Sequence, residues 1–309
     1  SGIKQCKQTK LCEIIFAWKM HKISAIISTK QLASAIVNCS KNVRVLDASW
    51  YLPAMKRNPK EEFESTHIPG AQFFNIDDCC DKSSSFDHML PSPQEFENYV
   101  GRLGISNKTH VVVYDTNDTF GIFSAQRVWW TFRVFGHDLV SVLDGGFSRW
   151  CSDGQPVTAE KYNYPFEKFE AKFRPHLIKV FPDIETNLKE KNFQLVDARA
   201  TGRFNGTAPE PRLGIKPGHI PGSINIPFSE IMDPETKTVK TKDELQKLFR
   251  NAGLDLQKPL VATCGSGVTA CCIALAAFLC GKEDVQIYDG SWVEWYFKSK
   301  PEQRRCCPE

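Results

Sequence analysis

The sequence predicts an α/β protein made of two similar halves, each a mainly parallel sheet with helices on both faces. Its 309 residues are too many for one small core and suit two domains of about 150 residues each. An internal repeat supports this division. Short apolar runs also alternate with helical stretches in both halves, which is typical of parallel sheets.

The internal repeat consists of three motifs that return in the same order, at an offset of about 150 residues. Ordered self-similarity of this kind indicates a tandem duplication. The motif pairs are Leu46-Asp47-Ala48 with Val196-Asp197-Ala198, His67-Ile68-Pro69-Gly70 with His219-Ile220-Pro221-Gly222, and Leu143-Asp144-Gly145 with Tyr288-Asp289-Gly290. We therefore expect a basic extension over 1–28, a first domain over 29–154, a connection over 155–182, a second domain over 183–300 and a tail over 301–309.

The first 28 residues are basic, with five lysines and only one acid, Glu13, from residue 3 onward. This composition fits either a disordered tail or a mitochondrial address, although such addresses are usually rich in arginine. The 12 cysteines follow no regular spacing, so we expect reduced thiols in the cytoplasm, the mitochondrion or both. No Cys-x-x-Cys pair occurs, so no metal site is expected.

Each half contains an apolar run with the length of a buried strand, Val111-Val112-Val113-Tyr114 in the first and Leu260-Val261-Ala262-Thr263 in the second. Helical stretches over 123–135 and 268–280 follow, and a glycine ends each of them. The connection over 155–182 is polar, aromatic and interrupted by prolines, so we expect it to run along the surface.

Several kinds of partner are disfavoured by composition. A net charge of +3 is too small to predict nucleic acid binding. No apolar run reaches the length of about 18 residues that predicts a membrane helix. The pair Cys306-Cys307 is either incidental to a frayed tail or able to form an intermolecular disulfide. We therefore expect a monomer or a redox-linked dimer.

The second half places a cysteine, Cys264, at the end of its central apolar strand. Ligands of open parallel sheets bind beyond the carboxyl ends of the strands. Gly265 and Gly267 allow a tight turn that can aim backbone N–H groups at one spot before a helix. Such surroundings favour a thiolate. The predicted feature is an anion cradle with a nucleophilic cysteine, formed by Cys264, Gly265, Ser266, Gly267, Val268 and Thr269.

The residues disfavour two alternatives to a reactive Cys264. A buried structural cysteine is common at a strand end, but the flanking glycines favour function. A cysteine-dependent phosphatase needs an arginine six positions after its cysteine, where this chain has Ala270. The repeat places Asp115 opposite Cys264, and a carboxylate cannot carry a persulfide. The first half is therefore predicted to be catalytically silent.

Two such halves, with a Cys-x-x-Gly-Val-Thr loop in the second, resemble the tandem rhodanese sulfurtransferases over about residues 29–300. The resemblance implies two rhodanese-like domains and sulfur transfer through a persulfide on Cys264, without metal or organic cofactor. Further markers are Leu46-Asp47-Ala48-Ser49-Trp50-Tyr51 and Asp289-Gly290-Ser291-Trp292-Val293-Glu294-Trp295.

The loop residues distinguish two substrate classes within that family. Members that use thiosulfate carry two basic residues directly after the cysteine, whereas members that use 3-mercaptopyruvate carry Cys-Gly-Ser-Gly-Val-Thr, as here. The resemblance therefore implies 3-mercaptopyruvate as donor, with pyruvate released. The implied acceptor is thioredoxin, another thiol or cyanide, and a dithiol acceptor releases hydrogen sulfide. The alternatives are a thiosulfate:cyanide sulfurtransferase and a carrier or regulatory module without turnover.

The resemblance also implies roles for residues outside the loop. Arg203 and Arg212 would hold the substrate's carboxylate and carbonyl, because forked guanidinium donors match a carboxylate. Ser266 would relay a proton together with Asp77 and His88 of the first half. The chain departs from the family at Asn75, where relatives often carry Asp. Without the resemblance, the sequence would be read more simply: Arg203 and Arg212 as solvated arginines on a loop, and Asp77 and His88 as surface or helix-capping residues.

Overall fold

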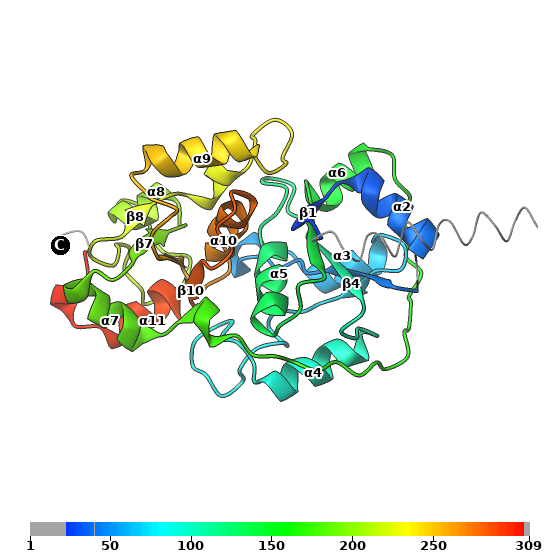
Figure 1. Cartoon of the computed structure of the whole chain (residues 1–309), viewed down its shortest axis with the longest axis horizontal. Helices are drawn as coiled ribbons and strands as arrows, with labels where there is room; N and C mark the ends of the chain where they lie inside the picture. The colour runs from blue at the N-terminus through cyan, green and yellow to red at the C-terminus, as the bar shows by residue number, and fades with distance from the viewer. Residues whose placement is uncertain (1–22, 40, 306–309) are drawn as a thin grey trace, which may run out of the picture.

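The computed structural model describes residues 23–39 and 41–305, and Figure 1 shows two lobes side by side along the long axis. Most of the predicted basic extension and the Cys306-Cys307 pair lie outside the described residues. Each lobe holds one five-stranded sheet, with the order β1-β5-β4-β2-β3 in the first and β6-β10-β9-β7-β8 in the second. All neighbouring strands in both sheets are parallel. The identical order confirms the predicted parallel α/β fold.

The strands and α-helices follow one another in the same order in each lobe, whereas the short 3₁₀ helices (η) fall at different places. The first lobe consists of β1 (Ile26–Ile27), α2 (Thr29–Cys39), β2 (Val43–Asp47), η1 (Pro53–Met55), α3 (Pro59–Ser65), β3 (Gln72–Phe73), α4 (Pro93–Arg102), β4 (His110–Tyr114), α5 (Ala125–Val134), β5 (Val140–Leu143) and α6 (Gly146–Ser152). The second consists of η2 (Pro175–Leu177), β6 (Ile178–Lys179), α7 (Phe181–Glu190), β7 (Gln194–Asp197), α8 (Thr201–Asn205), β8 (Ile224–Asn225), η3 (Phe228–Ile231), α9 (Lys242–Asn251), β9 (Leu260–Thr263), α10 (Ala270–Leu279), β10 (Gln286–Tyr288), α11 (Ser291–Lys298) and η4 (Pro301–Gln303).

Local sequence explains where equivalent helices begin. Ser92 caps α4 and Thr241 caps α9, each in a reciprocal capping box with a glutamate three residues later. The central helices differ, because every residue of α5 is buried and most of α10 is buried as well. Such helices need apolar neighbours on all sides.

Two short strands lie inside segments that the sequence assigns to the extension and the connection. β1 falls within 1–28 and pairs with β5, and β6 falls within 155–182 and pairs with β10. The helix α7 also begins at Phe181, before the expected start of the second domain. Edge strands of two residues are too short to produce a periodic pattern, so their sequence resembles a loop.

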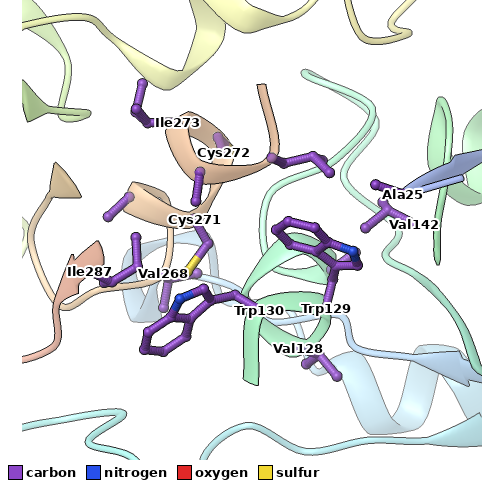
Figure 2. Close-up of a cluster of buried hydrophobic side chains, with 14 of the residues drawn as sticks. Ala25, Val128, Trp129, Trp130, Val142, Val268, Cys271, Cys272, Ile273 and Ile287 are labelled. Atoms are coloured by element: carbon purple, nitrogen blue, oxygen red, sulfur yellow. The ribbon is translucent and has the colours of Figure 1, made fainter. Parts of the chain in front are cut away.

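The two lobes share one hydrophobic core at the junction of α5 and α10, which lie side by side in the centre of Figure 1. Figure 2 shows Trp129 and Trp130 of α5 next to α10, with Cys271 pointing toward Trp130 and Cys272 further along α10. All four side chains are at most 1% exposed. Within the described part of the chain, no helix is both long and apolar enough to cross a membrane.

Candidate active site

The loop after β9 places Cys264 at the junction of the two lobes. Its side chain is 1% exposed. The N–H of Cys264 donates to Oγ of Ser291 at 3.1 Å, and its carbonyl accepts from the N–H of Trp292 at 2.9 Å. From Gly265 to Thr269, no backbone N–H donates to another residue that the structure describes. These amides are therefore available to an anion beside the thiol.

Gly267 makes the tight turn of this loop possible. Its φ of +79° lies in the left-handed region, and a Cβ there would stand 2.8 Å from the carbonyl oxygen of Asp289. The turn takes the chain directly from β9 to α10, and Ser266 faces the first lobe, where it contacts His88.

Ser266, His88 and Asp77 form a hydrogen-bonded chain across the junction. Ser266 Oγ lies 3.0 Å from His88 Nδ1, and His88 Nε2 lies 3.1 Å from Asp77 Oδ1. Burial by itself would raise the pKa of Asp77, but the hydrogen bond and charge of His88 bring it below its ordinary value. The charged carboxylate therefore favours a proton on Nε2, which leaves Nδ1 to accept from the Ser266 hydroxyl.

Trp50 and the backbone conformation hold His88 in this hydrogen-bonded arrangement. The indole N–H of Trp50 donates to Asp77 Oδ2 at 3.0 Å, and its ring meets the imidazole edge-on at 4.8 Å. His88 has a φ of +63°, which is uncommon for a residue with a side chain. The sequence did not single out Trp50, although it stands in the marker run that follows β2.

The two predicted arginines both lie against Gly265. A Cβ at Gly265 would stand 2.9 Å from Arg203 Nη2 and 3.7 Å from Arg212 Nη1. Arg212 Nη2 donates to Ser266 Oγ at 3.1 Å, and its Nε donates to Asp87 Oδ2 at 2.8 Å. Among the described residues, no acceptor faces Nη1 of either arginine. Each therefore keeps donors for a bound carboxylate or carbonyl.

Glu210 fixes the direction of Arg203, a role that the sequence did not reveal. Its two oxygens accept from Arg203 Nε at 3.0 Å and Nη2 at 2.6 Å, and Arg199 Nη1 adds a third bond at 2.7 Å. Burial would raise the pKa of Glu210, but the two guanidinium groups hold it below its ordinary value. The carboxylate thus stays charged and keeps Arg203 beside Gly265.

The first lobe fills its equivalent loop with its own carboxylate. Asp115 follows β4 as Cys264 follows β9, and its Oδ2 accepts the backbone N–H groups of Phe123, Ser124 and Ala125, each at 2.8 Å. Burial raises the pKa of Asp115, although these hydrogen bonds oppose the rise. The amides at the start of α5 therefore bind an anion that belongs to the chain itself.

A surface hollow of about 770 Å³ lies elsewhere, between α9 and the end of α10, where Phe249 and Lys282 line it. It contains none of the residues described above, so its size says nothing about the chemistry of Cys264. Over 23–39 and 41–305, no group of three or more His, Cys, Asp or Glu side chains is placed to hold a metal ion.

Comparisons with known proteins agree with this architecture. The family model described as the rhodanese-like domain matches residues 28–153 and 182–298. A 3-mercaptopyruvate sulfurtransferase of Rattus norvegicus is 54% identical over 280 residues, which cover 90% of this chain and 94% of the relative. A thiosulfate sulfurtransferase of Gallus gallus is 51% identical over 282 residues, with 91% and 96% covered.

Solved structures show the same fold. SseA from Escherichia coli, described as a 3-mercaptopyruvate sulfotransferase with the rhodanese fold, superimposes with a TM-score of 0.78 at 34% identity. The match covers 87% of this chain and 99% of that one. The predicted pair of tandem domains is thus confirmed. The chain belongs to the rhodanese family, with one rhodanese-like domain in each lobe.

Proposed function

We propose that this chain is a sulfurtransferase that takes sulfur from 3-mercaptopyruvate onto Cys264 and passes it to a thiol acceptor. The observation that carries the proposal is the meeting of Ser266, His88 and Arg212 beside an uncharged Gly265-Ser266 loop. Relatives named for 3-mercaptopyruvate and for thiosulfate are nearly equal in identity, at 54% and 51%. The loop separates the two substrates better than overall similarity does.

In the first half-reaction, the Cys264 thiolate attacks the sulfur of 3-mercaptopyruvate. A sulfur–sulfur bond forms, the carbon–sulfur bond breaks, and its electron pair leaves as the enolate of pyruvate. Arg203 and Arg212 bind the carboxylate and carbonyl, and their charge stabilises the enolate oxygen. The Ser266–His88–Asp77 chain takes up the proton of the substrate's thiol on the free Nδ1 of His88 and returns it through Ser266 to the enolate carbon. The products are pyruvate and a Cys264 persulfide.

In the second half-reaction, an acceptor thiolate attacks the outer sulfur of the persulfide and releases the Cys264 thiolate. The acceptor then carries the persulfide. A dithiol protein such as thioredoxin can attack again with its second thiol, which releases hydrogen sulfide and leaves the acceptor as a disulfide. Cyanide accepts the outer sulfur in the same way. We place this activity in the cytoplasm, the mitochondrion or both, as the reduced thiols suggest.

Intact-mass analysis after addition of 3-mercaptopyruvate tests the nucleophile. We expect the unaltered protein to gain one sulfur atom and Cys264→Ser to gain none. The matched control is Cys151→Ser, which alters an exposed thiol on α6 and should leave sulfur loading unchanged. An adduct that persists on Cys264→Ser would place the nucleophile elsewhere.

Steady-state kinetics test the substrate and the two remaining alternatives. A higher kcat/KM for thiosulfate than for 3-mercaptopyruvate would make the chain a thiosulfate:cyanide sulfurtransferase. Pyruvate release with catalytic amounts of protein, in the presence of a thiol acceptor, distinguishes an enzyme from a carrier, because a carrier without turnover stops after one equivalent.

A further inference from the structure

Arg127 of α5 is a buried cation at the junction of the lobes, and none of the chemistry above uses it. Its side chain is 3% exposed although the helix belongs to the first lobe. Nη1 donates to the carbonyl of Gly267 at 3.1 Å and lies 2.8 Å from Asp289 Oδ1. Nη2 donates to the carbonyl of His88. One guanidinium thus joins the cysteine loop of the second lobe to the histidine of the first.

Asp289 holds the same histidine segment from a second point. Its Oδ2 accepts the N–H of Leu90 at 2.8 Å, while its Oδ1 faces Arg127. The backbone is therefore held on both sides of Met89, at His88 by Arg127 and at Leu90 by Asp289 of the second lobe. Because a φ of +63° at His88 costs free energy, the segment keeps it only where its surroundings impose it.

The repeat supplies a comparison on the silent side of the junction. There Lys237 occupies the place of His88 with a φ of +58°, and Asp144 Oδ1 accepts the N–H of Val239 at 2.8 Å. The backbone clamp is thus present twice. The arginine is not, because aligning the starts of α5 and α10 puts Cys272 opposite Arg127.

Cys272 cannot do what the guanidinium does. It is fully buried, and burial raises the pKa of its thiol far above the ordinary value, so the side chain stays neutral. A buried ion pair such as Arg127–Asp289 adds little net stability, because the cost of desolvating the two charges offsets much of their attraction. Its placement on the reactive side alone points to function.

We propose that Arg127 is a positioning residue that holds His88 and the Cys264 loop at the spacing required for the Ser266–His88 hydrogen bond. The inference rests on the proposed function, since it concerns the proton relay of that reaction. Arg127 acts through the carbonyl oxygens of His88 and Gly267 and touches no reacting atom.

Arg133 offers a matched control on the same helix. It is also buried, at 7% exposed, and its Nη2 donates across the junction to the carbonyl of Glu283 at 2.9 Å. Its guanidinium stacks on Trp129 and Phe278, away from Cys264. Arg133→Gln therefore removes an equivalent contact between the lobes without disturbing the relay.

Kinetics of pyruvate release compare Arg127→Gln, Arg127→Lys and Arg133→Gln. We expect Arg127→Gln to lower kcat by about 100-fold with KM changed by less than about threefold, because small misplacement of catalytic groups is costly. Arg127→Lys keeps the charge facing Asp289 but loses the paired donors of the guanidinium, so we expect kcat to fall about tenfold. Arg133→Gln should stay within about threefold of the unaltered protein.

Combination with His88→Ala separates positioning from general damage. If Arg127 acts through His88, then Arg127→Gln lowers kcat by less than about threefold further once the imidazole is gone. Equal losses from Arg127→Gln in both backgrounds would overturn the proposal. An equal loss from Arg133→Gln would do the same, because it would assign the effect to packing between the lobes.

A substrate-free readout keeps this test apart from the choice of sulfur donor. The chain has seven histidines, and His88→Ala identifies the His88 ring signals in protein carrying ¹⁵N-labelled histidine. Arg127→Gln should shift those ring signals, and Arg133→Gln should leave them in place. Unchanged His88 signals in Arg127→Gln would overturn the inference, whether or not 3-mercaptopyruvate is the donor. A failure of sulfur loading in the unaltered protein would count only against the proposed function.

Discussion

Asp77 favours a proton on Nε2 of His88, which leaves Nδ1 free to accept from Ser266, and the charge of Asp77 matters more here than its shape. The hydrogen bond from His88 Nε2 holds the pKa of Asp77 low despite the burial that would raise it, so the carboxylate is ionised at neutral pH. An asparagine has nearly the same size but can present an N–H group to Nε2. The imidazole would then carry its proton on Nδ1, where it cannot accept from Ser266.

We therefore expect Asp77→Asn to lower the kcat of pyruvate release by about 100-fold or more. The matched control is Asp78→Asn, because Asp78 is the next carboxylate and pairs with Asn75 Nδ2 at 3.0 Å and with Lys82 at 3.7 Å. Steady-state kinetics of both variants check the prediction. Similar rates in the two variants would show that the Asp77–His88 contact has no part in proton transfer.

Gly265 sets the room available to the two arginines. A methyl group there would stand 2.9 Å from Arg203 Nη2, the end of a side chain that Glu210 holds in place. The displaced guanidinium can no longer meet a substrate carboxylate at its best distance. We expect Gly265→Ala to raise KM for 3-mercaptopyruvate by about tenfold, which corresponds to about 1.4 kcal/mol.

Loading of Cys264 in Gly265→Ala provides the control for this prediction. Cys264→Ser abolishes the nucleophile, whereas Gly265→Ala should still gain one sulfur atom at saturating donor. Circular dichroism melting should show little change, because the clash involves the far end of a side chain and not backbone. A fall in kcat at unchanged KM would show that Gly265 serves the chemical step and not substrate binding.

Single residues differ in how visible they are in the sequence. Cys264 and Ser266 lie in one short loop, so their proximity follows from the motif. Asp77 and His88 are far from that loop in the chain, and only the family resemblance linked them to it. Arg127 carries no local signal, because a lone arginine in an apolar helix resembles a solvated residue until the partner lobe is in place. The proposed roles of all these residues stay predictions until the variants are measured.

At the scale of elements, two histidines are held without charge at neutral pH, half-buried His110 at the start of β4 and buried His137 just after α5. His110 Nε2 lies 2.9 Å from Ser141 Oγ, and His137 Nε2 lies 2.9 Å from the carbonyl of Thr109. Burial lowers the pKa of each imidazole from 6.5 to about 4. Between these pH values the unfolded chain binds more protons than the folded protein, so the free energy of unfolding falls as the pH falls from 6.5 towards 4.

Urea titrations at about pH 7.5, above this window, and at about pH 5, inside it, check this acid sensitivity. Asp47, whose pKa burial raises to about 7, acts in the opposite direction and offsets part of the loss in the unaltered protein. We expect His137→Gln to lose about 2 kcal/mol less unfolding free energy between these pH values than the unaltered protein does. The matched control is His176→Gln, which alters an exposed histidine of η2. An unchanged pH dependence in His137→Gln would mean that other groups cause the acid sensitivity.

Equivalent elements also show why the duplication was easier to predict than its boundaries. The strands β4 and β9 are long apolar runs, and they lie where the sequence places them, with β4 beginning one residue earlier. The edge strands β1 and β6 have two residues each, and only pairing with β5 and β10 defines them. Hydrogen bonding to a neighbour creates these strands, so no pattern within their own residues could reveal them.

On the scale of the whole molecule, the shared core should couple the stability of the two lobes. Trp129 of α5 is 1% exposed and meets Phe278 of α10 with ring centroids 5.4 Å apart. Trp150 of α6 is equally buried, but its hydrophobic cluster contains residues of the first lobe only. The two tryptophans therefore form a matched pair that separates packing between the lobes from packing within one.

Hydrogen exchange in β2 and β7, which occupy equivalent interior positions in the two sheets, tests this distinction. Removing a buried tryptophan side chain costs about 3–5 kcal/mol. We expect Trp129→Ala to lower the opening free energy of both strands, because either lobe loses part of its contact surface when the other no longer fills it. Trp150→Ala should lower that of β2 much more than that of β7. If Trp129→Ala also affected β2 alone, the second lobe would owe nothing to the first, and the duplication would supply residues for the relay without supplying stability.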